Sequence, residues 1–167
     1  MRVSGRVVRM GDNIDTDLII PARHLKYTDP DYLAVHVFEA LGEEFRRKLR
    51  GSVISAGKAF GIGSSREQAA IALKAAGVNA VLAESFSRIF YRNAINNGLP
   101  VLECKAEMLG LLEEGDEVVI DVEKGIVESP RGIIACKPVR GLALEILRRG
   151  GLMYYLMEIG KTACPQL

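Results

Sequence analysis

The chain passes twice from a short apolar run through a polar insert into a segment with helical spacing. Residues 52–57, SVISAG, precede the insert AFGIGSSREQAA at 59–70, and the spacing predicts a helix over 65–76 that ends at Gly77. Residues 79–85, NAVLAES, lead in the same way into SFSRIFYRNAINNG at 85–98. Strands that alternate with helices are typical of parallel βαβ units. The sequence therefore predicts an α/β protein.

The flanking segments extend this core. RVSGRVVRM at 2–10 and PVLEC at 100–104 are predicted strands, and residues 115–139 alternate apolar and polar side chains as an antiparallel meander does. Parallel units followed by a meander predict two β layers with helices outside, rather than a doubly wound sheet. We expect one domain over residues 1–167.

Helices are also predicted before and after these strands. Residues 29–50 keep helical spacing over about five turns, with Gly42 as the point where the helix would break. In the same segment, Glu43 and Glu44 are spaced to pair with Arg47 and Lys48 on a solvated face. Residues 140–160 predict two short helices divided at Gly150–Gly151, and we interpret their apolar side chains as core, with self-association as the alternative.

Composition excludes several classes of function. Lysine and arginine number 22 against 21 acidic residues, so the net charge of +1 gives no reason to expect nucleic acid or a membrane surface as partner. Cys104, Cys136 and Cys164 are far apart and the chain has two histidines, so no metal-ligand spacing is present and we expect no metal site. The sparse cysteines and an N-terminus without an apolar signal core favour a reducing cytoplasm. No apolar stretch is long enough to cross a bilayer.

The insert at 59–70 fits none of the common ligand-binding or catalytic loops. A phosphate-binding P-loop needs Gly-Lys-Ser/Thr after its glycines, and a dinucleotide fingerprint needs a third glycine where Arg66 stands. A hydrolase elbow needs a histidine after the nucleophile, whereas both histidines precede Ser64.

Two interpretations of the insert remain open. Ser64 and Glu67 form the S-x-x-E pattern of a capping box, which explains those two residues by helix stability alone. Arg66, Gly61 and Gly63 are left over, and together with a helix N-terminus they offer a guanidinium and backbone N–H groups to an anion.

Three motifs, in this order, carry a resemblance to a known family: GDNIDTDLIIPARHL at 11–25, FGIGSSREQAA at 60–70 and AESFSRIFYRNAINNGLP at 83–100. The chain resembles the aconitase superfamily and, at this length, the small subunits of its isopropylmalate and homoaconitate hydro-lyases. The resemblance implies a swivelling β/β/α three-layer domain similar to the aconitase C-terminal domain. It also implies a large-subunit partner, in a heterodimer or heterotetramer, that carries a [4Fe-4S] cluster, so that this chain needs no cofactor of its own.

The resemblance also implies roles for individual residues. Ser64 corresponds to the base that removes the proton beside a substrate carboxylate, and Arg66 binds that carboxylate together with Gly63 and Ser65. The physical chemistry agrees, because a serine acts as a base only where positive potential stabilises its alkoxide. Gln68 stands where many relatives have histidine, a departure that we expect to matter little.

In this family the loop after the DTDLIIPA run at 15–22 reads the variable group of the substrate, and here that loop contains His24, Lys26 and Tyr27. A lysine either pairs with a carboxylate or lays its methylenes against an apolar group. We favour isomerisation of 2-isopropylmalate to 3-isopropylmalate by dehydration and rehydration, with homoaconitate as the alternative substrate. A carboxylate- or phosphate-binding module without catalysis is the alternative function.

Other polar residues are expected to support these loops. Asp15 and Asp17 fit Asx-type turns. Asn93 and Asn96 share a helix face from which they could anchor the Ser64 loop, with capping at the surface as the alternative. His36 is interpreted as a helix residue packed against its neighbours.

Overall fold

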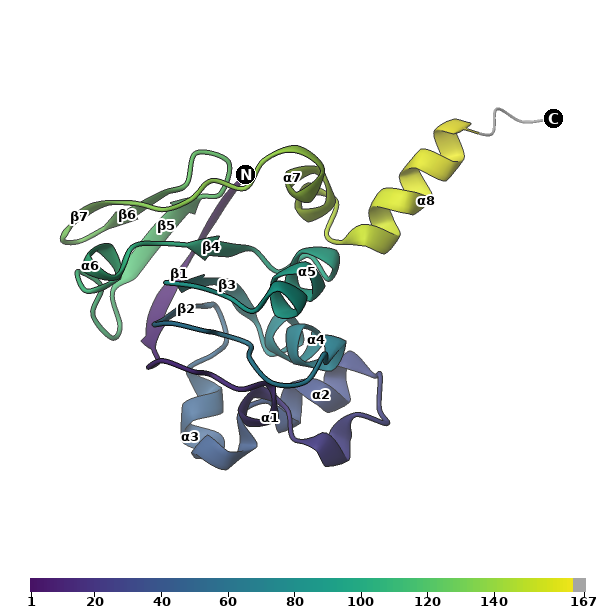
Figure 1. Cartoon of the computed structure of the whole chain (residues 1–167), viewed down its shortest axis with the longest axis horizontal. Coiled ribbons are helices and arrows are strands. Elements are labelled where there is room, and N and C mark those ends of the chain that lie inside the picture. The colour runs from purple at the N-terminus through teal and green to yellow at the C-terminus, as the bar shows by residue number, and fades with distance from the viewer. Residues whose placement is uncertain (164–167) are drawn as a thin grey trace.

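The computed structural model describes residues 1–163 and is built on one curled seven-stranded sheet (Figure 1). The strands lie in the order β4-β3-β2-β1-β5-β6-β7. Four of them are mutually parallel, and β5 to β7 form the antiparallel meander. Their bounds are β1 Arg2–Arg9, β2 Ser52–Ala56, β3 Val78–Ala83, β4 Val101–Glu103, β5 Glu117–Asp121, β6 Ile126–Ser129 and β7 Gly132–Ala135.

The helices are short and mostly connect the strands. They are α1 Thr16–Ile19, α2 Pro30–His36, α3 Gly42–Arg47, α4 Glu67–Ala75, α5 Arg88–Asn96, α6 Ala106–Leu109, α7 Gly141–Arg148 and α8 Leu152–Ala163, with 3-10 turns at Ala22–His24 and Glu39–Leu41.

The strand order explains the layers. Strands β1 to β4 lie side by side in chain order, so each right-handed crossover places its helix on the same face of the sheet. Figure 1 shows α2, α4 and α5 together on that side. The other face is covered by the meander, which curls back until its end meets the end of β4. There the N–H of Lys137 donates to the carbonyl of Glu103 over 2.7 Å. The predicted β/β/α arrangement is confirmed.

Burial is deepest where α4 packs on the parallel strands. Every residue of β2 is buried, as expected for a strand covered on both faces. On α4 the buried face consists mainly of small side chains, which let the helix lie close to the sheet: Ala69, Ala70, Ala72 and Leu73. This packing fixes the N-terminus of α4, and with it the insert.

The single long helix predicted over 29–50 is wrong. Helix α2 ends at His36, and Phe38 adopts a left-handed conformation with φ of 47°. The N–H of Phe38 donates to the carbonyl of Ile19 over 2.8 Å, and its ring is fully buried. Tertiary packing of Phe38 therefore breaks the helix before Gly42, which is the first residue of α3. On α3 the predicted pair of Glu43 and Arg47 forms over 2.6 Å.

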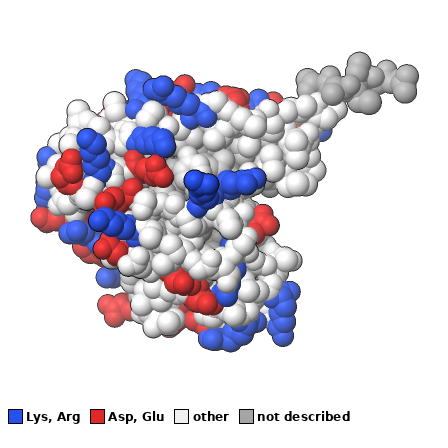
Figure 2. All heavy atoms as spheres, in the orientation of Figure 1, with Lys and Arg blue, Asp and Glu red and all other residues white. Residues whose placement is uncertain are grey.

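The interpretation of the C-terminal apolar residues as core is also wrong for α8. This helix projects from the body (Figure 1), and the face of it seen in Figure 2 is mostly uncharged. Met153 is 67% exposed and Leu156 is 51% exposed. The division at Gly150–Gly151 is confirmed and lets α8 leave the direction of α7. Within residues 1–163, no helix combines the length and the apolar character that crossing a membrane requires.

Two cysteines that are distant in sequence are bonded to each other. Cys104 follows β4 and Cys136 follows β7, and they form a disulfide across the two edges of the curled sheet, 32 residues apart in sequence. Their spacing gave no sign of this, because the curl of the sheet brings them together. Cys164 lies outside the described residues.

Candidate active site

The insert lies at the carboxyl ends of the parallel strands, pressed against the loop that follows β1. Three backbone hydrogen bonds join the two loops: Asn13 N–H to the Lys58 carbonyl at 2.7 Å, Gly61 to Ile14 at 2.7 Å, and Thr16 to Ile62 at 2.8 Å. The hydroxyl of Thr16 also donates to the carbonyl of Ser64 over 3.2 Å. The first and second motifs therefore form one unit.

The third motif holds the insert from the other side. The Phe60 N–H donates to the Ser85 carbonyl, and the Ser87 N–H donates to the Phe60 carbonyl, each over 3.0 Å. The Ser87 hydroxyl donates to the carbonyl of Gly61 over 2.6 Å and accepts from the N–H of Phe90, so it also caps α5. All three motifs thus converge on residues 57–66.

The two glycines of the insert are required by close packing. At Gly61, where φ is 78°, a Cβ atom would lie 2.2 Å from the ring of Phe90. At Gly63, where φ is 96°, it would lie 2.7 Å from the carboxylate of Asp15. The N–H of Gly61 also donates to the carbonyl of Ile14. The sequence suggested that this N–H would bind an anion, but it is already paired.

The capping box predicted at 64–67 is not formed. The N-cap of α4 is Arg66, whose side chain makes no capping bond. Glu67 accepts instead from the side-chain amide of Asn97 over 3.1 Å. Asn97, not Asn93 or Asn96, is therefore the asparagine that holds this end of α4.

The N-terminus of α4 has unpaired donors. Within the described part of the chain, the N–H groups of residues 63–66 have no hydrogen-bond acceptor, and Gly63, Ser64 and Ser65 are exposed to solvent. Unpaired N–H groups and the helix dipole make such an end a site for anions. The geometry favours the anion-site interpretation over capping.

Arg66 adds a positive charge to this end. Its side chain is only 10% exposed and forms an ion pair with Asp17. The guanidinium Nη2 also lies 3.4 Å from the Ser64 hydroxyl, while Nε is buried without a partner among the described residues. Asp17 is presented by the predicted turn, in which its N–H donates to Asp15 over 2.7 Å. A buried donor without a partner costs stability, so the position of this guanidinium is held against a local penalty.

Residues 22–27, the recognition segment, lie beside the same helix. The side-chain amide of Gln68 on α4 donates to the carbonyl of Leu25 over 3.0 Å. Lys26 is exposed, with its Nζ 5.1 Å from the ring centre of Tyr27, which is 38% exposed. Gln68 was expected to matter little, yet it links this segment to the helix that carries Ser64.

His24 differs from its neighbours in the recognition segment because it is buried. Its Nδ1 lies 2.9 Å from the Tyr32 hydroxyl and its Nε2 lies 3.1 Å from Oε2 of Glu39. Both ring nitrogens are thus engaged within the chain. Burial, followed by the charges of His36 and Arg23, lowers the pKa of His24 from its ordinary value of 6.5. A neutral ring at pH 7 suits a role in holding the segment better than contact with a substrate carboxylate.

One group of described residues has the side-chain types that bind metal ions: His24, His36 and Glu39. Their possible ligand atoms lie within 4.8 Å of one another. His36 Nδ1 lies 3.0 Å from the same Oε2 of Glu39, and the two imidazole rings stack with centres 4.0 Å apart and 20° between planes. A metal ion binds in the plane of each imidazole, and stacked rings do not direct their lone pairs at one point. The geometry favours a hydrogen-bonded cluster.

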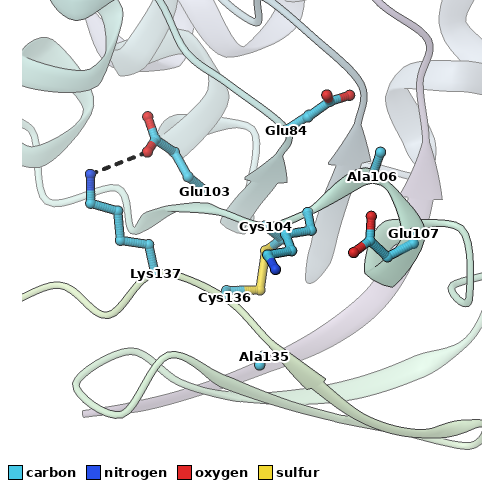
Figure 3. A pocket seen from close by; sticks show the side chains of 9 residues that line it. Glu84, Glu103, Cys104, Ala106, Glu107, Ala135, Cys136 and Lys137 are labelled. Carbon is cyan, nitrogen blue, oxygen red and sulfur yellow. Dashed lines mark hydrogen bonds and ion pairs between the residues drawn. A yellow bond between two sulfur atoms is a disulfide. The ribbon is translucent and has the colours of Figure 1, made fainter.

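Cluster ligation has a separate requirement, namely several cysteine thiolates. Among the described residues, Cys104 and Cys136 are bonded to each other and so offer none. They line a cavity of about 580 Å³ between the ends of β4 and β7, where Glu103 and Lys137 point toward one another (Figure 3). Ser64 and Arg66 do not line it. Within residues 1–163, Gly63, Ser64 and Ser65 are exposed, so the candidate site lies on an open surface.

Comparison with known proteins decides the family. Residues 9–107 match the aconitase C-terminal domain. The 3-isopropylmalate dehydratase small subunit of Saccharolobus solfataricus is 58% identical over 160 residues, which cover 95% of this chain and 96% of that protein. The chain belongs to the family of 3-isopropylmalate dehydratase small subunits. The small subunit of Pyrobaculum aerophilum is 57% identical over 158 residues, covering 93% and 98% of the two chains.

A solved structure extends the agreement to the fold of this small-subunit family. The crystal structure of 3-isopropylmalate dehydratase from Methanocaldococcus jannaschii matches with a TM-score of 0.89 at 44% identity, and the match covers 98% of each chain. The resemblance found in the three sequence motifs is confirmed. The name small subunit implies a large-subunit partner for these relatives.

Proposed function

We propose that this chain is the small subunit of a hydro-lyase that converts 2-isopropylmalate to 3-isopropylmalate by dehydration and rehydration, a step of leucine biosynthesis. The observation that carries the proposal is the N-terminus of α4, where Ser64 lies among unpaired N–H groups beside the guanidinium of Arg66. The 58% identity to dehydratase small subunits supports the substrate.

The first task of the site is to bind a substrate carboxylate. The donors for it are the unpaired N–H groups of Gly63 and Ser65, which flank Ser64 in the chain, and the guanidinium of Arg66, 3.4 Å from the Ser64 hydroxyl. Asp17 holds the guanidinium in place, much as a carboxylate orients an arginine in other anion sites. Binding holds the carbon next to the carboxylate near the Ser64 oxygen. The translational and rotational entropy of bringing these two atoms together is therefore lost on binding and not during proton transfer.

The second task is proton transfer. The Ser64 oxygen takes the proton from the carbon beside the carboxylate, and the hydroxyl group departs from the neighbouring carbon to leave a double bond. Hydroxide then adds to the carbon that lost its proton, and Ser64 returns that proton to the carbon that lost the hydroxyl, so the net change is the position of the hydroxyl. The α4 dipole and Arg66, 3.4 Å away, stabilise the alkoxide form of Ser64. A [4Fe-4S] cluster on the large subunit would supply a Lewis acid for the departing hydroxyl.

The exposure of the site supports a catalytic partner. Gly63, Ser64 and Ser65 face solvent in the isolated chain, where water would hydrate an alkoxide. We propose that the cluster-bearing large subunit covers this face in a heterodimer or heterotetramer. A cytoplasmic location is part of the same proposal and rests on the biosynthetic role, since the disulfide between Cys104 and Cys136 removes the support that the cysteine count gave.

Titration of the chain into the separately purified large subunit tests this function. Formation of the unsaturated acid from 3-isopropylmalate, followed by absorbance, is expected to rise with added chain and to saturate. Absence of turnover with an intact cluster would overturn the assignment. Binding of an anion without turnover would favour the alternative of a carboxylate- or phosphate-binding module, and turnover of homoaconitate alone would favour the homoaconitase alternative.

A further inference from the structure

The recognition segment, residues 22–27, has little regular structure of its own. Its internal hydrogen bonds are His24 N–H to Pro21, Leu25 to Ala22 and Tyr27 to His24, at 3.0, 3.1 and 3.0 Å. Short 3-10 turns of this kind have poor hydrogen-bond geometry. The position of Lys26 and Tyr27 therefore depends on contacts made by the rest of the segment.

His24 is the buried anchor of the segment, only 5% exposed. The hydroxyl of Tyr32, on α2, lies 2.9 Å from its Nδ1, and Oε2 of Glu39 lies 3.1 Å from its Nε2. The ring of Tyr32 also lies against that of Tyr27, with centres 4.0 Å apart. One residue on α2 therefore contacts both the anchor and the exposed end of the segment.

Glu39 joins two consecutive residues of the segment to the turn before α3. Its Oε2 is shared by His24 and His36, and its Oε1 forms an ion pair with Arg23 without a hydrogen bond. The Glu39 side chain is only 18% exposed, so these partners compensate a carboxylate that is largely withdrawn from water. Two attachment points on adjacent residues fix the orientation of the segment as well as its location.

The opposite side of the segment is tied to the candidate catalytic helix. Gln68, in the first turn of α4, donates to the carbonyl of Leu25 over 3.0 Å. The segment is thus held between α4, which carries Ser64 at its N-terminus, and the cluster around Glu39. The backbone of the segment is therefore held on both sides of Leu25, by His24 and by Gln68.

We propose that Glu39 and Tyr32 are positioning residues that fix the recognition segment, so that they determine which variable group of the substrate is accepted at Lys26 and Tyr27. This inference rests on the proposed function, since it concerns the specificity of that same site. Both act through the residues of the segment that they contact: Tyr32 through His24 and Tyr27, and Glu39 through Arg23 and His24.

Two variants test the proposal in the enzyme reconstituted with its large subunit. Tyr32→Phe removes only the hydroxyl that meets His24, and Glu39→Gln removes the charge that pairs with Arg23. For each we expect the ratio of kcat/KM for 3-isopropylmalate to that for homoaconitate to shift by about fivefold or more. The shift should come mainly from KM, with kcat changed by less than about twofold, because the chemistry at Ser64 is untouched. Glu43→Gln, which breaks an exposed ion pair on α3, is the matched control and should leave the ratio unchanged.

Amide hydrogen exchange of the isolated chain provides a readout that is independent of activity. Both variants should accelerate exchange at the amides of His24, Leu25 and Tyr27 by about tenfold while leaving β2 unchanged. An unchanged substrate ratio, or unchanged exchange in the segment, overturns the proposal. Faster exchange in β2 as well would mean a general loss of stability and would also overturn it. If the unsubstituted enzyme turns over neither substrate, the proposed function fails instead. Amide exchange does not require turnover, so it still shows whether Glu39 and Tyr32 hold the segment, and the two failures can be distinguished.

Discussion

The hydroxyl of Thr16 donates a hydrogen bond of 3.2 Å to the carbonyl oxygen of Ser64, although the two residues are 48 positions apart in the chain. Thr16 begins α1, whose N-cap Asp15 also packs against Gly63. The loop after β1 therefore sets the conformation of the insert at the residue proposed as the base.

Loss of this bond should affect catalysis more than stability. Thr16→Val keeps the shape of the side chain and removes its hydroxyl, so we expect kcat of the reconstituted enzyme to fall by about threefold to tenfold, in line with a net hydrogen-bond contribution of about 1 kcal/mol. Steady-state kinetics measure the effect. Ser129→Ala removes a comparable hydroxyl-to-carbonyl bond in the β6–β7 turn and should leave kcat unchanged. Equal effects of the two variants would contradict a specific link between Thr16 and Ser64.

The packing at Gly61 predicts a loss of stability. Gly61→Ala places a Cβ atom within 2.2 Å of the Phe90 ring at a φ of 78°, so we expect the free energy of unfolding to fall by about 2–3 kcal/mol. Denaturant unfolding measures this. Gly160→Ala in α8 meets no atom within 4 Å and should be neutral or slightly stabilising, since alanine favours helix. A Gly61→Ala variant as stable as the parent would mean that the loop rearranges easily.

Because of the disulfide, we expect the free energy of unfolding to depend on whether the chain is oxidised or reduced. Cys104 and Cys136 close a loop with a sequence separation of 32 residues, and reduction should lower the free energy of unfolding by roughly 3–4 kcal/mol. Thermal unfolding with and without reductant tests this, with the double variant C104A/C136A as control, which should not respond to reductant. The fold should persist on reduction because the seven-stranded sheet and its buried core do not depend on the disulfide. Identical transitions of the parent chain in both conditions would contradict the prediction.

The hydrogen bonds of Asp116 lead us to expect that the stability of the fold depends on pH. The N–H of Glu113, followed by the side chain of Arg131, lowers the pKa of Asp116 below its ordinary value of 3.8. A carboxyl whose pKa is lowered by folding contributes stability above its unfolded pKa, and that contribution is lost as the pH falls through the folded value. Asp116→Asn should therefore be less stable than the parent at pH 6, and the difference should shrink as the pH falls below about 4. A difference that stays constant over pH 2–6 would show that ionisation of Asp116 is not involved.

The parallel strands, the meander and the three motifs could be predicted because each is a local pattern. The order of the three motifs predicted the family, and Ser64 and Arg66 lie together as expected. The break at Phe38 could not be predicted, since it depends on a partner, Ile19, from another element. The disulfide was missed for the same reason, because only the curl of the sheet brings β4 to β7.

The supporting residues of the site were the hardest to predict. Asn97 holds Glu67, whereas the sequence offered Asn93 and Asn96, with surface capping as the alternative. Helix phase at the end of α5 decides which asparagine faces α4. Gln68 contacts Leu25 through a backbone carbonyl, for which no residue type in the recognition segment gives a signal. Such contacts depend on how elements pack rather than on what their own residues are.

The most direct test of the central claim is the turnover of 3-isopropylmalate by the Ser64→Ala variant assembled with its large subunit. Exchange of the substrate proton with solvent should be measured in the same samples, and complex formation should be checked by size-exclusion chromatography. If Ser64 is the base, the variant binds the large subunit normally while kcat and proton exchange fall together by about 10²- to 10⁴-fold. Turnover and exchange close to those of the unsubstituted enzyme would contradict the assignment of Ser64.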